Sequence, residues 1–138
     1  SLLCTAESPA IPFALIASLQ QQLYPGWQLC CRLPDATLAV LRESAPTEEG
    51  PDELSYLALQ EPRLTVLAGD QVTSVAAHLN QMLAASDGDF VAVVGQGDTL
   101  DFELLARVAV AIDADPSVDL LYTDEDTIVQ WAARCSHA

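Results

Sequence analysis

The stretch "GDFVAVVGQGDTLDFELL", residues 88–105, joins a continuous apolar run, a polar turn and the start of a helical pattern. Apolar side chains at every position of "FVAVV" predict a strand that is buried on both faces, as in a parallel sheet. After the turn, Leu100, Leu104, Val108 and Ile112 recur at the spacing of one helix face. A buried strand that leads directly into a helix indicates an α/β fold.

The same alternation continues along the rest of the chain. Four more apolar runs predict strands, namely "SLLCTA" (1–6), "WQLCCRL" (27–33), "RLTVLAG" (63–69) and "VDLLYTD" (118–124). Residues at helical spacing separate these runs. Leu15, Leu19 and Leu23 precede the run at 27–33, and a stripe of apolar residues within 72–83 precedes the run at 89–95. We therefore expect a three-layer α/β/α domain over residues 1–128 with a mostly parallel sheet. Segment 43–55, rich in Pro, Gly and Glu, predicts a mobile surface loop, and 129–138 a C-terminal tail.

Composition limits the classes of partner. The chain has 138 residues, 51% hydrophobic residues and a mean hydropathy of +0.25, which fits one domain with a packed core. No apolar run approaches the ~20 residues that span a bilayer, so we expect no transmembrane segment. Twenty acidic residues against five arginines give a net charge of −15. Such a surface repels phosphate backbones, which excludes nucleic acid as a partner.

Cysteine and histidine spacing does not predict a metal site. Cys4, Cys30, Cys31 and Cys135 form no C-x-x-C motif, and the two histidines have no ligand spacing with them. We interpret the thiols as reduced core residues, which favours a reducing compartment, the cytoplasm.

Ligands of parallel sheets bind beyond the carboxyl ends of the strands, which directs attention to the turn Gly95-Gln96-Gly97-Asp98. Three interpretations are open for it: a phosphate cradle, a metal site that lacks ligands, or a plain turn. Asp98 is either a metal ligand or the N-cap of the following helix, and the cap is favoured. Glu7 and Asp35, after the first two strands, are either ribose-binding acids or surface acids. The cluster 124–126, "DED", offers oxygen ligands or is a solvated turn.

Three segments resemble family 2 glycosyltransferases, the inverting enzymes of GT-A fold that use nucleotide-activated sugars. They are "QQQLYPGWQLC" (20–30), "NQMLAASDGDFVAVVGQGDTL" (80–100) and "DADPSVDLLYTDEDTI" (113–128), and the resemblance is colinear from Ser1 to Ile128. It implies a Rossmann-like nucleotide-sugar-binding half with strand order 3-2-1-4 and a further strand or edge element at 118–124. The family's acceptor-binding half, with its catalytic base, would follow Ile128.

The chain departs from the family where the resemblance places the ligands. The segment Thr5 to Glu7 stands in place of "P-T-Y-N", and Asp35 lies one position after the family's aspartate pair. Gly95, Gln96 and Gly97 replace the D-x-D that holds Mg²⁺ or Mn²⁺ and the diphosphate, which leaves Asp98 alone. Because a divalent cation needs several oxygen ligands, the resemblance implies impaired donor binding.

Two hypotheses about function follow from the resemblance. In the first, the chain is a sugar-transferase domain that binds a nucleotide-sugar donor with Mg²⁺ or Mn²⁺. In the second, it is a non-catalytic interaction or scaffold domain derived from a glycosyltransferase, whose partner is another domain or a second copy. The altered turn favours the second hypothesis or an impaired enzyme, and no catalytic residue is predicted.

Overall fold

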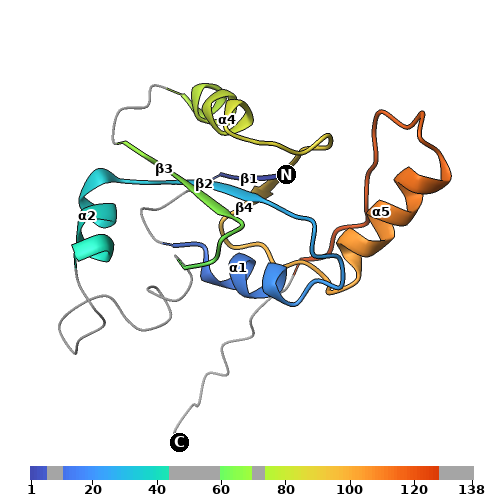
Figure 1. Cartoon of the computed structure of the whole chain (residues 1–138), viewed down its shortest axis with the longest axis horizontal. Helices are drawn as coiled ribbons and strands as arrows, with labels where there is room; N and C mark the ends of the chain where they lie inside the picture. Colours follow the sequence, from blue (N-terminus) through green and yellow to red (C-terminus); the bar gives the residue numbers. More distant parts are fainter. Residues whose placement is uncertain (6–10, 44–59, 70–73, 128–138) are drawn as a thin grey trace, which may run out of the picture.

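The computed structural model describes residues 1–5, 11–43, 60–69 and 74–127 (Figure 1). Four strands form one sheet: β1 (Leu2–Thr5), β2 (Leu29–Leu33), β3 (Leu64–Ala68) and β4 (Ala92–Gly95). Every pairing is parallel, and the spatial order is β3-β2-β1-β4. The strand order 3-2-1-4 that the resemblance implied is therefore confirmed, together with the parallel α/β fold.

Helices cover both faces of this sheet and make the predicted three layers. Figure 1 shows α4 (Val75–Ala84) above the sheet and α1 (Phe13–Gln20) below it. The α4 side has a small core in which Leu3, Cys30 and Met82 are buried. The α1 side has the larger core, which combines alternate strand residues with apolar helix residues: Leu2, Cys4, Ile11, Leu15, Ile16, Leu19, Trp27, Leu29, Cys31, Leu33, Leu38 and Val94. Burial on both faces explains the continuous apolar runs of β1 and β2. β3 is only partly buried, and in β4 Ala92 and Val93 are exposed while Val94 is buried, so the prediction that the β4 run is buried on both faces is wrong.

Two further helices of the described residues begin at positions that differ from the sequence interpretation. Helix α2 (Asp35–Glu43) follows β2 at once, with Asp35 in its first turn and Leu38 buried. Helix α5 (Leu104–Ala114) begins four residues after Leu100, and Glu103 is its N-cap. The prediction that Asp98 caps this helix is therefore wrong. None of the described helices has the length and apolar character needed to span a lipid bilayer.

Side chains of α1 and its C-terminal flank explain the late start of α5. Ser18 Oγ accepts a hydrogen bond from the Leu100 N–H at 3.1 Å. Gln22, which is only 9% exposed, donates to the Asp101 carbonyl at 2.7 Å and accepts from the Leu105 N–H at 3.1 Å. These bonds satisfy backbone groups of residues 100–105 that a longer helix would otherwise use. They fix the position of the turn after β4 against α1.

The segment 118–127 has no regular secondary structure, so the strand predicted at 118–124 is not present. Leu120 and Tyr122 are 80% and 92% exposed. An apolar, β-branched run becomes a strand only where another strand offers its backbone, and no strand among the described residues pairs with this run. The predicted loop at 43–55 and the tail at 129–138 fall almost wholly outside the described residues.

Candidate functional site

The carboxyl edge of β1 and β4 brings together four of the residues that the sequence singled out. Thr5 and Gly95 are register partners at the ends of these strands. The Gln96 N–H donates to the Thr5 carbonyl at 3.1 Å, and Thr5 Oγ1 donates to the Val94 carbonyl at 3.2 Å. The turn Gly95–Asp98 therefore continues from a strand pair that fixes its starting position.

Asp98 closes this turn. Its Oδ2 accepts the Gly95 N–H at 2.6 Å, and its own N–H donates to the Gly95 carbonyl at 3.1 Å. A Cβ atom built on Gly95 would lie 3.1 Å from that carboxylate oxygen, whereas one on Gly97 would have no atom within 4 Å. The carboxylate thus occupies space that a side chain at position 95 would need, while position 97 faces open space.

The carboxylate of Asp98 also affects the core behind the turn. Burial and, secondarily, the negative charge of Asp98 raise the pKa of the Cys4 thiol to about 11. Burial similarly raises the pKa of Cys31 to about 12, with the thiols of Cys4 and Cys30 as further causes. These thiols remain protonated at neutral pH, which makes them poor nucleophiles and poor metal ligands.

Of the other predicted site residues, Asp35 and the acidic run 124–126 are described and Glu7 is not. Asp35 is exposed in the first turn of α2, after the neighbouring strand β2. Glu7 lies outside the described residues. The acidic run 124–126 is exposed in the irregular segment, where Asp126 Oδ1 accepts the Thr127 N–H. The acid pair that the sequence analysis weighed, Glu7 with Asp35, stays a prediction because Glu7 is outside the described residues.

The described residues of this edge do not fit a divalent cation. Asp98 is the one carboxylate of the turn, and it is bonded to the Gly95 backbone. Across the described ranges, no group of three or more His, Cys, Asp or Glu side chains could hold a metal ion. Mg²⁺ usually takes one or two carboxylates together with substrate phosphates, and the turn offers one that is already engaged.

Arg32 is a charged residue near this edge that the sequence analysis did not single out. It lies near the end of β2 on the α4 side, and its guanidinium donates to the Gly69 carbonyl at 3.0 Å and to Gln81 of α4. Gly69 has φ +137, and a Cβ there would lie 2.5 Å from Arg32 Nη2, so glycine is required. Burial and then the charge of Arg32 lower the pKa of His78. Alternation along β2 directs Arg32 toward the face opposite Cys31 and Leu33, where its donors serve the protein's own carbonyls.

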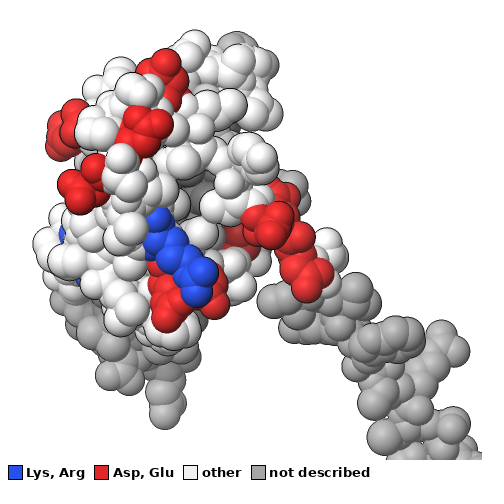
Figure 2. Space-filling model, turned by 90° about the vertical axis from the view of Figure 1, so that its right-hand side faces the viewer, with Lys and Arg blue, Asp and Glu red and all other residues white. Residues whose placement is uncertain are grey.

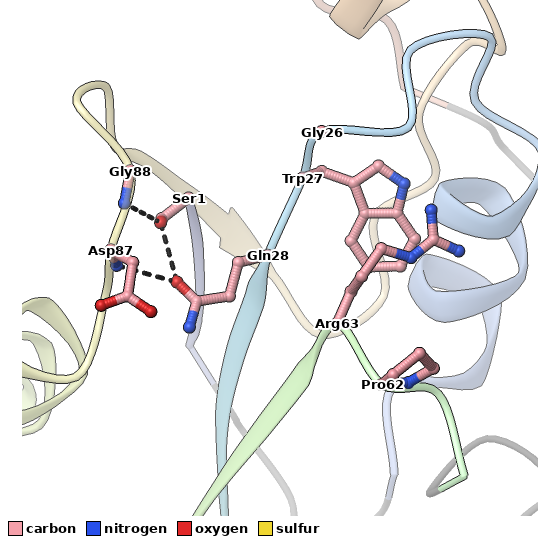
Figure 3. A pocket seen from close by; sticks show the side chains of 8 residues that line it. All are labelled: Ser1, Gly26, Trp27, Gln28, Pro62, Arg63, Asp87 and Gly88. Atoms are coloured by element: carbon pink, nitrogen blue, oxygen red, sulfur yellow. Dashed lines mark hydrogen bonds between the residues drawn. The ribbon is translucent and has the colours of Figure 1, made fainter.

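A groove of about 360 Å³ lies at the opposite edge of the sheet, where the strands begin (Figure 3). Its lining residues precede the four strands: Ser1, Gly26, Trp27, Gln28, Pro62, Arg63, Asp87 and Gly88. Gln28 Oε1 accepts from Ser1 Oγ and from the Asp87 N–H, both at 3.0 Å. Ligands of parallel sheets bind at the carboxyl ends, so this groove is separate from the expected site.

The basic side chain of the groove is already paired. The Arg63 guanidinium lies 3.8 Å from the centre of the Trp27 ring, and its Nε donates to Glu61 at 2.7 Å. Figure 2 shows acidic side chains in several groups over one face of the molecule, with few basic ones between them. The pairing and the acidic surface leave this groove without a free cation for a phosphate ligand.

Two known proteins are similar to the chain. It is 30% identical over 128 residues to the uncharacterized protein y4gI of Sinorhizobium fredii, which covers 92% of this chain and 13% of that protein. It is 36% identical over 116 residues to the O-antigen biosynthesis protein RfbC of Myxococcus xanthus, covering 80% of this chain and 8% of RfbC. The chain thus spans a small part of the relatives it matches. No protein-family model matches it.

Proposed function

We propose that this chain is a nucleotide-sugar-binding domain of the family 2 glycosyltransferase type whose metal- and diphosphate-binding turn is impaired. Three observations support the proposal: the colinear resemblance, the strand order β3-β2-β1-β4, and the similarity to a segment of an O-antigen biosynthesis protein. The ligand edge of such a fold is formed by Thr5 and the turn Gly95–Asp98.

The contact between Asp98 and Gly95 is the observation that most supports impaired binding of metal and diphosphate at this turn. The carboxylate that remains in the turn accepts the Gly95 N–H at 2.6 Å, and glycines stand at the two D-x-D positions. Transfer from a nucleoside diphosphate requires charge neutralisation on the leaving phosphate, by a metal ion or by arginine and lysine. Among the described arginines, Arg32, Arg63 and Arg107 are bonded elsewhere. The donor would therefore bind weakly and without metal dependence.

The decisive experiment restores the two carboxylates. The double variant Gly95→Asp/Gly97→Asp would place a D-x-D at the end of β4, and Asp98 would have to swing out because its oxygen occupies the space at position 95. The matched control is Gly95→Asn/Gly97→Asn, which has the same size without the charge. Calorimetric titration with UDP-, GDP- and dTDP-sugars, with and without Mn²⁺, measures the result.

We expect the aspartate variant to gain Mn²⁺-dependent affinity for one of the donors, and the asparagine variant to gain none. Failure of the aspartate variant to bind any donor, while its circular dichroism spectrum matches that of the wild type, would contradict the assignment of this turn. Equal gains in both variants would show that charge at these positions is irrelevant, and would also contradict it.

A second candidate function is an interaction or scaffold domain, which a separate observation favours. Large apolar side chains are exposed on the last strand and helix, with Val93 57% and Val110 69% exposed. No residue of α5 is buried. Exposed large apolar side chains are the kind of surface that a protein partner can cover.

A further inference from the structure

The first turn of α5 stops one hydrogen bond short of Asp101. Asp101 has the contacts of a helix N-cap, because its Oδ1 accepts the Glu103 N–H at 2.9 Å and its carbonyl accepts the Leu104 N–H at 3.0 Å. Glu103 already has helical φ and ψ values of −94° and −9°, and its own side chain makes no cap bond. The bond that would start a helix at Phe102 runs from the Leu105 N–H to the Asp101 carbonyl.

The side chain of Gln22 lies between these two groups. Its Nε2 donates to the Asp101 carbonyl at 2.7 Å, and its Oε1 accepts the Leu105 N–H at 3.1 Å. The next carbonyl, that of Phe102, accepts the N–H of the neighbouring Leu23 at 3.0 Å. One side-chain amide therefore bridges the donor and the acceptor that would otherwise bond each other in the helix.

We propose that the Gln22 amide is a latch between two starts of α5. With the amide inserted, α5 begins at Leu104, as in the structure. With the amide withdrawn, the Leu105 N–H bonds the Asp101 carbonyl directly, and α5 begins at Phe102 with Asp101 as its N-cap. The exchange adds two residues to the helix and needs no other change of its hydrogen-bond direction.

The two states are close in hydrogen bonding, which lets the latch exchange. Withdrawal breaks the two bonds that the Gln22 amide makes across to α5, and it creates one helical bond in their place. The Nε2 group keeps the Ser18 carbonyl, 3.4 Å away, as a partner. Because Gln22 is only 9% exposed, water does not fully replace the lost partners. The inserted state is therefore the major one and the withdrawn state the minor one.

The latch lies beside the ligand edge, and its effect there rests on the proposed function. Thr99 and Leu100 are the two residues that separate Asp98 from Asp101 along the chain. A change in the start of α5 therefore reaches the segment that carries Asp98 and its contact to Gly95. The C-terminal flank of α1 thereby controls how firmly the turn is closed.

Scalar couplings across hydrogen bonds, measured by NMR, identify the donor and acceptor of each bond. In the wild type, we expect the Leu105 amide nitrogen to couple to the side-chain carbonyl carbon of Gln22. In Gln22→Met the coupling should move to the Asp101 carbonyl carbon, and the Cα shift of Phe102 should become more helical. The new bond replaces one of the two that are lost, so this variant stays less stable than the wild type. Gln21→Met, at an exposed position, is the matched control and should keep the wild-type couplings.

Relaxation dispersion of the wild type tests the exchange itself and does not depend on the folding of a variant. Leu105 should show exchange on the microsecond to millisecond timescale, which Gln21→Met keeps and Gln22→Met loses. Gly95 should share its rate. A wild type without dispersion at Leu105, or a folded Gln22→Met without coupling to Asp101, overturns the latch. Dispersion that Gly95 does not share would contradict control of the turn. Neither result bears on the donor titration, which tests the proposed function.

Discussion

The carboxylate of Asp98 accepts a hydrogen bond from the backbone N–H of Gly95 at 2.6 Å, across the turn that ends β4. This contact engages the one acid of the turn that could have bound a cation at the ligand edge. The proposed loss of metal binding depends on it.

The two residues should be energetically coupled. Asp98→Ala removes an exposed charge-assisted hydrogen bond, and we expect it to lower the free energy of unfolding by about 1 kcal/mol. Gly95→Ala puts a Cβ 3.1 Å from the carboxylate oxygen and pushes it away, so it removes the same bond. Urea denaturation of the two single variants and the double variant should give a coupling energy of about 0.5–1 kcal/mol.

Gly97→Ala is the control for that cycle, because a Cβ there would have no atom within 4 Å. Its stability should equal or slightly exceed that of the wild type, since alanine restricts the unfolded chain. Strictly additive effects of Gly95→Ala and Asp98→Ala would mean that the two residues do not act through one contact.

Gln22 should be the most important polar side chain for the position of the turn. It is 9% exposed and bonds the Asp101 carbonyl and the Leu105 N–H, both beyond β4. Gln22→Met fills a similar volume but leaves the Leu105 N–H without its partner and the Asp101 carbonyl with only its bond from the Leu104 N–H, and we expect a loss of about 2 kcal/mol in the free energy of unfolding. The neighbouring exposed residue is the control: Gln21→Met should change stability by less than about 0.5 kcal/mol. Similar losses for the two variants in urea denaturation would refute this role.

Glu61 should make stability depend on acid pH. The side chain of Arg63 is the main cause that lowers the pKa of Glu61 from 4.5 to about 2. A carboxyl whose pKa is lowered by folding stabilises the fold at pH values above the pKa that it has in the unfolded chain. This contribution is lost as the pH falls from about 4.5 toward about 2. Glu61→Gln should therefore lower the free energy of unfolding at pH 7 by about 2 kcal/mol, part of the full linkage value being offset by solvent screening. The difference from the wild type should vanish near pH 2 in thermal denaturation.

A second acid–arginine pair in the chain is the control for Glu61. Glu103 and Arg107 are 2.6 Å apart on α5, four residues from each other, and the arginine is largely exposed. Exposed pairs of this kind contribute little, so Glu103→Gln should not measurably change stability. If Glu103→Gln destabilised the chain as much as Glu61→Gln, the burial of Glu61 and its bonds to Arg63 and Gln20 would not be the reason for the effect.

The core thiols should be chemically silent in the folded chain. Burial raises the pKa of Cys4 to about 11 and that of Cys31 to about 12, and it raises the pKa of Cys30 in the same direction. Iodoacetamide at pH 8, followed by peptide mass spectrometry, should label these positions only after denaturation. Rapid labelling of Cys4 in the native chain would show that the turn behind it opens frequently.

The strands and their order were predictable because their signal is local. Continuous apolar runs mark all four strands, although only β1 and β2 are buried on both faces, and short α/β connections leave few topologies. The strand predicted at 118–124 failed because pairing depends on a distant partner, which the run itself does not reveal. Helix α2 was missed although Pro34-Asp35 is a typical helix start, because Asp35 was interpreted as a ribose-binding or a surface acid and not as a helix residue.

The location of the candidate site was predictable, but the role of its acid was not. The carboxyl-end rule places ligands at the end of β4, and the structure joins Thr5, Gly95, Gln96 and Asp98 there. Asp98 was expected to cap a helix. It closes the turn instead, because Ser18 and Gln22 hold residues 100–105 and delay the helix to Leu104. Contacts between segments about 80 residues apart do not show in the local sequence.

The most direct test of the central claim is calorimetric titration of the unmodified chain with UDP-, GDP- and dTDP-sugars at saturating Mn²⁺, repeated with a chelator. If glycines at positions 95 and 97 and the engaged carboxylate of Asp98 leave no metal site, Mn²⁺ should make no difference to the heat of binding for any donor. Micromolar binding of any of the three that disappears with the chelator would contradict the account.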